Sequence, residues 1–215
     1  MAYNVPEGAV FYFSSTFASA KTITALTNAS PASATSTSHG FVDNDEILLT
    51  SGWEDATDTV WRVDQTDANS FGVLGLNSTN TNYFAAGSGT GSAQLISAWT
   101  TIPQVLSVAS SGGDPKRTTV QPLAKRNAFN ITTGFNPTDI TLTLAHDSSN
   151  ANFITMLDLS RTLTDVAFKM VLSGGNVTYG YGTLTVSEVP ALNVGQVNTV
   201  TCSISLRGRS ISYDT

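Results

Sequence analysis

The sequence of 215 residues contains one cysteine, two histidines and few charges, and these shortages exclude several classes of protein. Lysine, arginine, aspartate and glutamate make up only 12% of the chain, about half of the usual share. A single cysteine cannot form an intramolecular disulfide, and with two histidines it cannot complete a structural zinc site. A chain of this length buries a core without such staples, so we expect one sizeable domain, or one with a small second domain.

Long apolar runs are also missing. No stretch approaches the roughly 18 apolar residues of a membrane span, and the first ten residues lack the basic and apolar regions of a signal peptide. We therefore expect a soluble protein made in a reducing cytoplasm. Cys202 lies in an alternating run, residues 200–206, where we interpret it as a small buried residue and not as a reactive thiol.

The residues needed for catalysis do not occur in a recognisable pattern. His39 lies in a Ser-His-Gly turn and His146 at the end of a predicted strand, more than a hundred residues away. No Gly-x-Ser-x-Gly elbow supplies a nucleophile. Carboxylates at Glu54, Asp55 and Asp58 lie on a predicted loop, where spacing gives no geometric specificity for glycoside hydrolysis. We predict no enzyme activity and no catalytic residue.

Metal and cofactor sites are not predicted either. The segment Asp43-Asn44-Asp45-Glu46 lacks the twelve-residue calcium-loop pattern, and we interpret it as an acidic turn, with a weak cation site as the alternative. The glycines at 87, 89 and 91 do not open a helix after a strand and lack the phosphate-loop lysine, so we interpret them as a flexible connector. We expect no metal and no cofactor.

Charge is unevenly distributed along the chain. Residues 1–96 carry two basic and nine acidic side chains, net −7, whereas residues 97–215 carry eight and seven, net +1, which together give the overall −6. A specific nucleic-acid binder carries a basic face that neutralises phosphates, and this chain is acidic. Four basic residues do flank one predicted loop, where we favour protein contacts over phosphate contacts: Lys116, Arg117, Lys125 and Arg126.

Apolar and polar residues alternate through most of the sequence, with β-branched and aromatic side chains in the alternating runs. Glycine-rich clusters such as Ser173-Gly174-Gly175-Asn176 separate these runs, and this one predicts a tight hairpin. The pattern predicts an all-β fold with mostly antiparallel strands. The runs are residues 10–13, 22–26, 46–49, 60–63, 70–74, 140–144, 167–172, 176–188 and 196–209.

One segment has helical spacing instead. Within residues 150–160 the apolar Phe153, Met156 and Leu157 recur on one face, and residues 147–150 offer N-cap candidates. We predict a short helix here, with these three side chains packed on the sheet.

The change of charge near residue 96 suggests a domain boundary. Residues 21–95 read as about five short strands that end in a glycine-rich stretch, which predicts a small β-barrel module. The module would then interrupt a second domain formed by residues 1–20 and 96–215, since loop tips tolerate such insertions.

From residue 97 onward the order of elements resembles the tail tube proteins of siphophages, the bacteriophages with long non-contractile tails. The resemblance lies in the strand within Ala98–Val108, the Ser110–Gly113 turn, a polar loop through Lys116–Asn136, the strand Ile140–Ala145, the helix, and the final strands with Tyr179–Leu184. Residues 21–95 resemble a small β-module of phage virion proteins, related to a barrel domain of ubiquitin-activating enzymes.

The resemblance implies a β-sandwich or barrel with one flanking helix, six copies per ring, and rings stacked into a tube. The implied partners are other copies of the chain, the tape-measure protein, and the tail terminator and distal tail proteins, with DNA passing through without sequence-specific binding. The implied location is the virion tail, after assembly in the host cytoplasm. We expect the loop 110–136, with its four basic side chains, to contact the next ring.

Two alternatives remain open from the sequence. An adhesion or decoration module could bind host glycans through exposed aromatics such as Trp53 and Tyr83. A tube protein of a contractile particle would share the same fold.

Overall fold

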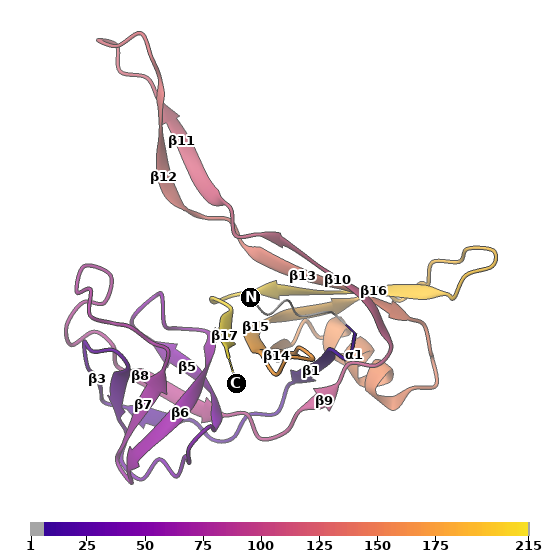
Figure 1. Ribbon diagram of the computed structural model, residues 1–215, viewed down its shortest axis with the longest axis horizontal. Coiled ribbons are helices and arrows are strands. Elements are labelled where there is room, and N and C mark those ends of the chain that lie inside the picture. Colours follow the sequence, from indigo (N-terminus) through magenta and orange to yellow (C-terminus); the bar gives the residue numbers. More distant parts are fainter. Residues whose placement is uncertain (1–6, 215) are drawn as a thin grey trace.

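The computed structural model describes residues 7–214, which contain 17 β-strands and one α-helix, so the predicted all-β fold with a single helix is confirmed (Figure 1). The first sheet has eight strands in the order β10-β13-β16-β15-β14-β1-β9, with β17 paired to β15. Its strands are β1 (Val10–Ser14), β9 (Thr100–Thr101), β10 (Val105–Gly112), β13 (Thr138–Ala145), β14 (Asp165–Val171), β15 (Val177–Val186), β16 (Thr199–Leu206) and β17 (Ile211–Tyr213).

The first sheet curls into a nearly closed barrel. Its two end strands, β9 and β10, are separated along the chain by only residues 102–104, so the ends of the sheet lie close together. Alternate residues of β16 and β15 point inward, where Cys202, Ile204 and Leu184 are fully buried. The seam of the barrel lies between β10 and the opposite end of the sheet, where β9 pairs with part of β1.

Helix α1 (Ala151–Arg161) packs against β15. Asn150 caps it, because its side-chain oxygen accepts hydrogen bonds from the backbone N–H groups of Asn152 (3.0 Å) and Phe153 (3.3 Å). The structure places Phe153 and Met156 in the barrel interior, and Leu157 partly buried against it.

The second sheet has seven strands in the order β2-β8-β5-β6-β7-β4-β3. The two end strands are separated by Thr24 alone, so this sheet also closes on itself around an apolar core. Seven strands replace the roughly five expected, because the run 22–26 is divided between β2 and β3, and because β4 and β8 have only one β-branched residue between them, Thr35. Its strands are β2 (Lys21–Ile23), β3 (Ala25–Leu26), β4 (Ala32–Thr35), β5 (Glu46–Ser51), β6 (Thr59–Asp67), β7 (Ser70–Leu74) and β8 (Gly91–Leu95).

The expected polar loop through Lys116–Asn136 is instead a β-hairpin, and this prediction was wrong. Strands β11 (Pro115–Val120) and β12 (Phe129–Phe135) pair with each other and with no other strand among the described residues. The hairpin, which we call the arm (residues 113–136), projects from the first sheet beyond β10 and β13 (Figure 1). Phe129, Ile131 and Phe135 occupy alternate positions of β12, but β11 has no such pattern, because both faces of the arm are exposed.

The chain crosses from one sheet to the other through two adjacent segments. Phe17 and Ile96 face each other as an isolated antiparallel bridge. Ala18 N–H donates to Leu95 O at 2.8 Å, and Ser97 N–H donates to Thr16 O at 3.2 Å. Entry to and exit from the second sheet therefore lie side by side.

Candidate functional site

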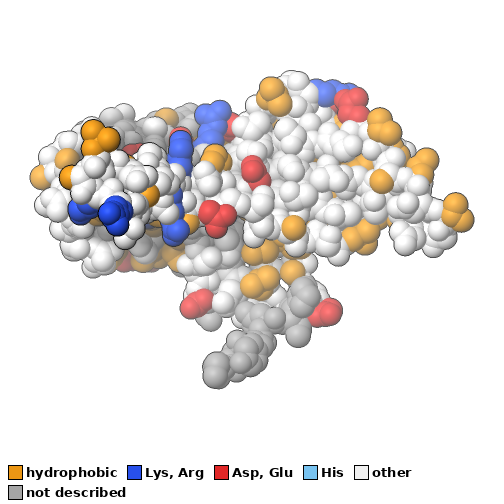
Figure 2. All heavy atoms as spheres, turned by 90° about the horizontal axis from the view of Figure 1, so that it is seen from above, with side chains coloured by type: hydrophobic (Ala, Val, Ile, Leu, Met, Phe, Trp, Pro, Cys, Tyr) orange, Lys and Arg blue, Asp and Glu red, His pale blue; other side chains and the backbone are white. Residues whose placement is uncertain are grey.

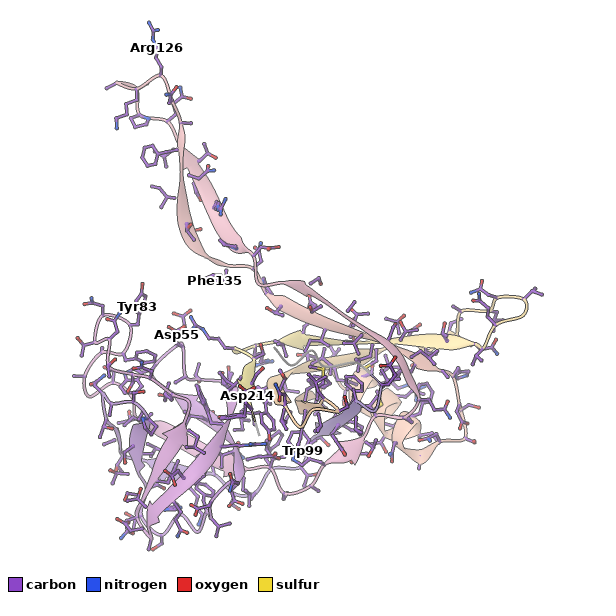
Figure 3. All side chains as sticks on the ribbon, in the orientation of Figure 1. Asp55, Tyr83, Trp99, Arg126, Phe135 and Asp214 are labelled. Atoms are coloured by element: carbon purple, nitrogen blue, oxygen red, sulfur yellow. The ribbon has the colours of Figure 1, made fainter. Side chains whose placement is uncertain are left out.

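The four predicted contact residues all lie on the arm. Lys116 and Arg117 belong to β11, and Lys125 and Arg126 lie in the turn that joins β11 to β12, with Arg126 at the extremity (Figure 3). All four side chains are exposed, and none forms an ion pair with the described part of the chain. Asp114 is the only acidic residue of the arm, which therefore carries a net charge of +3 (four basic, one acidic).

The arm also exposes large apolar side chains. Leu123 in the turn and Phe129, Ile131 and Phe135 on β12 are all solvent-exposed. A two-stranded hairpin is at best marginally stable alone in water, because it buries too little apolar area. An arm of this kind has the composition of a segment that another protein surface covers.

A polar cluster joins the two sheets. Glu46 of β5 accepts hydrogen bonds from Lys169 Nζ of β14 (2.6 Å), from Tyr179 OH of β15 and from Trp99 Nε1. The side chains of Glu46 and Lys169 are largely buried, at 13% and 20% exposure. The charges are therefore paired where solvent is scarce, as buried charges must be.

Arg62 of β6 extends this junction towards the C-terminal end of the described chain. Its Nε and Nη2 donate to Tyr179 OH at 3.1 and 3.0 Å, and its guanidinium lies 4.9 Å from the centre of the Tyr213 ring. Tyr213 OH donates to Leu74 O at 2.8 Å and accepts from Arg62 N–H at 3.0 Å. Strand β17 thus fastens the second sheet to the first.

Burial governs the titration of the tyrosines in this junction. Loss of solvent raises the pKa of Tyr179 above its ordinary value, and the hydrogen bond to the Glu46 carboxylate raises it further. Burial likewise raises the pKa of Tyr213. Both phenols are therefore neutral and able to donate hydrogen bonds throughout the physiological range.

A second set of contacts closes the junction near residue 208. Arg209 Nη2 lies 2.7 Å from Asp55 Oδ1. A Cβ atom on Gly208 would lie 2.2 Å from the backbone oxygen of Asp58, so only glycine permits this approach. Of the three carboxylates considered for glycoside hydrolysis, Asp55 is thus engaged in a structural ion pair.

The two histidines occupy structural positions. His39 is buried, with Nε2 2.9 Å from Asp67 O and Nδ1 accepting from Phe41 N–H at 3.0 Å. His146 stacks edge-on against Phe153. Cys202 is fully buried, and burial raises the pKa of its thiol to about 12, which keeps it protonated and unreactive.

Two interpretations of the second sheet need correction. The glycine-rich stretch 87–91 is not simply a flexible connector, because a Cβ on Gly91 would lie 1.9 Å from Thr50 O and one on Gly89 would lie 2.9 Å from the Trp53 ring. These glycines allow close backbone packing. Trp53 is only 2% exposed and donates to Ala85 O at 2.8 Å, so it cannot form a glycan platform with the exposed Tyr83.

The side chains of the predicted acidic turn have two different roles: Asp43 and Asp45 accept hydrogen bonds from the backbone, and Glu46 belongs to the junction. Asp45 Oδ2 accepts from Val42 N–H and Asp43 Oδ1 accepts from Gln65 N–H, whereas Glu46 turns into the junction. Among residues 7–214 no group of three His, Cys, Asp or Glu side chains could hold a metal ion. Within the same residues no helix is long and apolar enough to cross a membrane.

Sequence reasoning missed the junction cluster. Trp99, Lys169 and Tyr179 lie 53, 123 and 133 residues from Glu46 along the chain, and no local pattern links positions so far apart. A lysine in the middle of an apolar strand, as at Lys169, was the one available signal, since a charge there needs a partner.

Comparison with known proteins gives the chain its family. It is similar to one solved structure of the SPP1 tail tube, obtained by solid-state NMR and cryo-EM, with a TM-score of 0.42, 10% identity, and 55% of this chain and 70% of that chain covered. No curated protein matches the chain. The sequence profile described as phage tail tube protein matches residues 51–215, more than half of the chain. The chain therefore belongs to the phage tail tube protein family, and its role in the virion tail is structural and not enzymatic.

Proposed function

We propose that this chain polymerises as stacked hexameric rings into the tube of a siphophage tail, which encloses the tape-measure protein and then conducts DNA during ejection. The observation that carries the proposal is the arm, whose apolar and basic side chains have no covering element within the described chain. Membership of the phage tail tube protein family is the basis for proposing a tube. The resemblance to siphophage proteins is the basis for proposing six copies per ring and a non-contractile tail.

The arm is the element that links successive rings in this proposal. Its strands β11 and β12 pair only with each other among the described residues, so a neighbouring subunit that covers the exposed apolar side chains would add the burial that the hairpin lacks. The low charge of the rest of the surface reduces the desolvation penalty of tight packing, and Figure 2 shows how much of one face carries uncharged side chains.

The remaining partners follow from the tube. The tail terminator and distal tail proteins would contact its two ends, and assembly would occur in the host cytoplasm. DNA would pass through without sequence-specific contacts, since the chain carries a net charge of −6 and tight binders gain affinity from a basic surface. The second sheet would be an inserted module with the boundaries 21–95, and its relation to a barrel domain of ubiquitin-activating enzymes stays a prediction.

Negative-stain electron microscopy across a concentration series tests the proposal. We expect hollow tubes or rings of one diameter from the unsubstituted protein, and their absence at every concentration in the presence of tail-tip proteins would contradict it. Reversal of all four arm charges to glutamate should abolish tubes, and normal tubes from that variant would exclude the arm's basic residues from ring contacts.

A matched pair of variants separates the arm from net charge. Lys125→Gln with Arg126→Gln lowers the net charge by two, as does Thr66→Glu with Ala86→Glu on exposed positions of the second sheet. We expect only the arm variant to raise the protein concentration needed for tubes. If both double variants raise the protein concentration needed for tubes equally, the cause is the overall charge and not the arm.

A further inference from the structure

A second projection extends from the far side of the first sheet, where residues 187–198 join β15 to β16 (Figure 1). We call it the distal loop. Four of its apolar side chains are between 65% and 106% exposed, a degree of exposure that marks an interaction surface when it is concentrated in so short a segment. They are Val189, Leu192, Val194 and Val197.

The distal loop has a defined conformation. Ala191 and Thr199 exchange both backbone hydrogen bonds, at 2.8 and 3.2 Å, and Ser187 N–H donates to Thr201 O at 2.9 Å. Gln196 N–H donates to Asn193 O across the turn. The apolar side chains are thus held out on an extension of the β15–β16 hairpin, which makes their exposure a property of the folded chain.

No free charge interrupts this apolar surface. The one charged residue of the distal loop, Glu188, is bonded to Arg161 Nε at 2.7 Å at the base of the loop. Figure 2 shows orange side chains at the right-hand end of the face, where the distal loop projects. A partner that covers the loop therefore buries no unpaired charge, so no desolvation cost of that kind opposes binding.

The same chain carries an apolar groove at the seam of its barrel. The groove has a volume of about 510 Å³, and nine of its ten lining residues are uncharged, the exception being Glu7. Phe11 of β1 and Met170 of β14 form one side, and Leu106 and Val108 of β10 form the other. Both β10 side chains are exposed, and among the described residues β10 is an end strand that pairs with β13 alone.

The chain's own distal loop does not fill this groove. None of its residues lines the groove, and its four apolar side chains are open to solvent. Within residues 7–214 these two unlike apolar surfaces do not cover each other, so a contact between them would join two copies heterologously. Repetition of such a contact generates a closed ring or an open filament, which is the kind of symmetry that a tube requires.

We propose that the distal loop of one copy inserts its apolar side chains into the seam groove of a neighbouring copy. The inference rests on the proposed function, since it names the surfaces by which subunits of the tube meet. The occupant is a second copy because the tube surrounds each subunit with identical neighbours, and because the distal loop and the groove are both largely apolar, with Glu7 the one charged residue that lines the groove. The area that one loop can bury is smaller than the roughly 800 Å² per partner of a stable interface. The contact therefore forms only together with other contacts between the same copies.

Cysteine cross-linking in assembled tubes tests the contact directly. The native Cys202 is buried and unreactive, so Val194→Cys and Leu106→Cys introduce the only accessible thiols. With both substitutions on one chain, a short bis-maleimide should give a ladder of covalent oligomers on denaturing gels. The control pairs Leu106→Cys with Thr66→Cys on the second sheet and should give no ladder.

Each outcome decides the proposal. Normal tubes without a ladder above the control would overturn the contact and leave the tube function intact. A cross-link from Leu106→Cys to Val5→Cys and not to Val194→Cys would also overturn it, and would assign the groove to the first residues of the chain. Absence of rings and tubes from the unsubstituted protein at every concentration, with tail-tip proteins present, would overturn the tube function, and the contact with it.

A solubilising substitution provides a second readout. Val194→Asp should raise the protein concentration needed for tubes at least tenfold, because a charge would enter an apolar groove. Thr66→Asp is the matched control and should leave it unchanged. Assembly of Val194→Asp at the unsubstituted concentration would contradict the proposal.

Discussion

Glu46 lies where strands of both sheets meet, and its carboxylate accepts hydrogen bonds from three side chains that are remote in sequence. Removing one partner of such a cluster leaves the others buried without compensation, which costs more than the bond itself contributes. The sequence identified Glu46 as part of an acidic turn, and its partners could not be predicted because they depend on how the two sheets pack.

Tyr213 offers the simplest test of this junction. Tyr213→Phe removes the hydroxyl that serves Leu74 O and Arg62 N–H, and we expect the free energy of unfolding to fall by about 1–2 kcal/mol, as for unsatisfied partly buried groups. Urea denaturation measures the change. Tyr83→Phe, on an exposed side chain, is the control and should change stability by less than about 0.5 kcal/mol.

Alkaline pH should also weaken the fold at these residues. The pKa of Tyr179 is raised by burial, and that of Cys202 is raised to about 12. When the pKa of a group is raised in the folded state, the unfolded chain loses that proton at a lower pH than the folded chain does. The contribution of the group to the free energy of unfolding is therefore fully present below its pKa in the unfolded chain, about 8.5 for Cys and 10 for Tyr, and is lost as the pH rises above that value. The melting temperature should fall steadily from pH 9 to 11, and less steeply for Tyr179→Phe. A constant melting temperature over this range would refute the argument.

At the scale of elements, periodicity predicted the long strands and the helix, whose apolar positions repeat within one element. It failed for β4, which is rich in Ala and Ser, and for the arm, whose strands are exposed on both faces and so have no buried side to impose alternation. The residues predicted to contact the next ring were expected in a loop and lie instead on the β-hairpin arm, and their contact with a ring stays a prediction: Lys116, Arg117, Lys125 and Arg126. The distal loop was not predicted as a site, because valines between turn residues resemble the ends of two ordinary strands.

The arm should be the first element that a protease cuts. In the unassembled protein, trypsin should cleave after Lys125 or Arg126 before any other site, because this turn projects furthest from the packed sheets. Mass spectrometry of the early fragments identifies the cut. Lys125→Gln with Arg126→Gln should delay it, and assembled tubes should resist it. Early cleavage at Arg62 would contradict the described packing of the junction.

At the scale of the whole molecule, the two sheets are held together by buried side chains as well as by the chain crossings. Val60 of the second sheet packs in one apolar cluster with Ala167, Val177 and Tyr179 of the first. We therefore expect the two sheets to unfold together, although each has its own core. The sequence predicted the second unit from its charge and glycine content, but not its firm attachment, which depends on surfaces that carry no periodic pattern.

Gly208 tests that attachment. Gly208→Ala places a Cβ against the backbone oxygen of Asp58, and we expect a loss of about 1–3 kcal/mol, typical of overpacking against atoms that cannot rotate away. Hydrogen exchange should show the loss at residues 54–62 of the second sheet first. Ser210→Ala, at an exposed neighbouring position, is the control. A loss of protection shared by both sheets with no excess at residues 54–62 would argue against a local clash.

The paired crossings at Phe17 and Ile96 have a consequence for how such tubes diversify. Because the chain leaves and re-enters the first barrel at facing positions, the two points at which the second sheet is attached, which we call the socket, are already in contact. One appendage can replace another there without a change in barrel circumference, provided that the replacement brings its ends together and supplies a partner for Lys169. We expect lineages with the same barrel to carry unrelated appendages at this socket, or a short turn, while their tubes keep one bore.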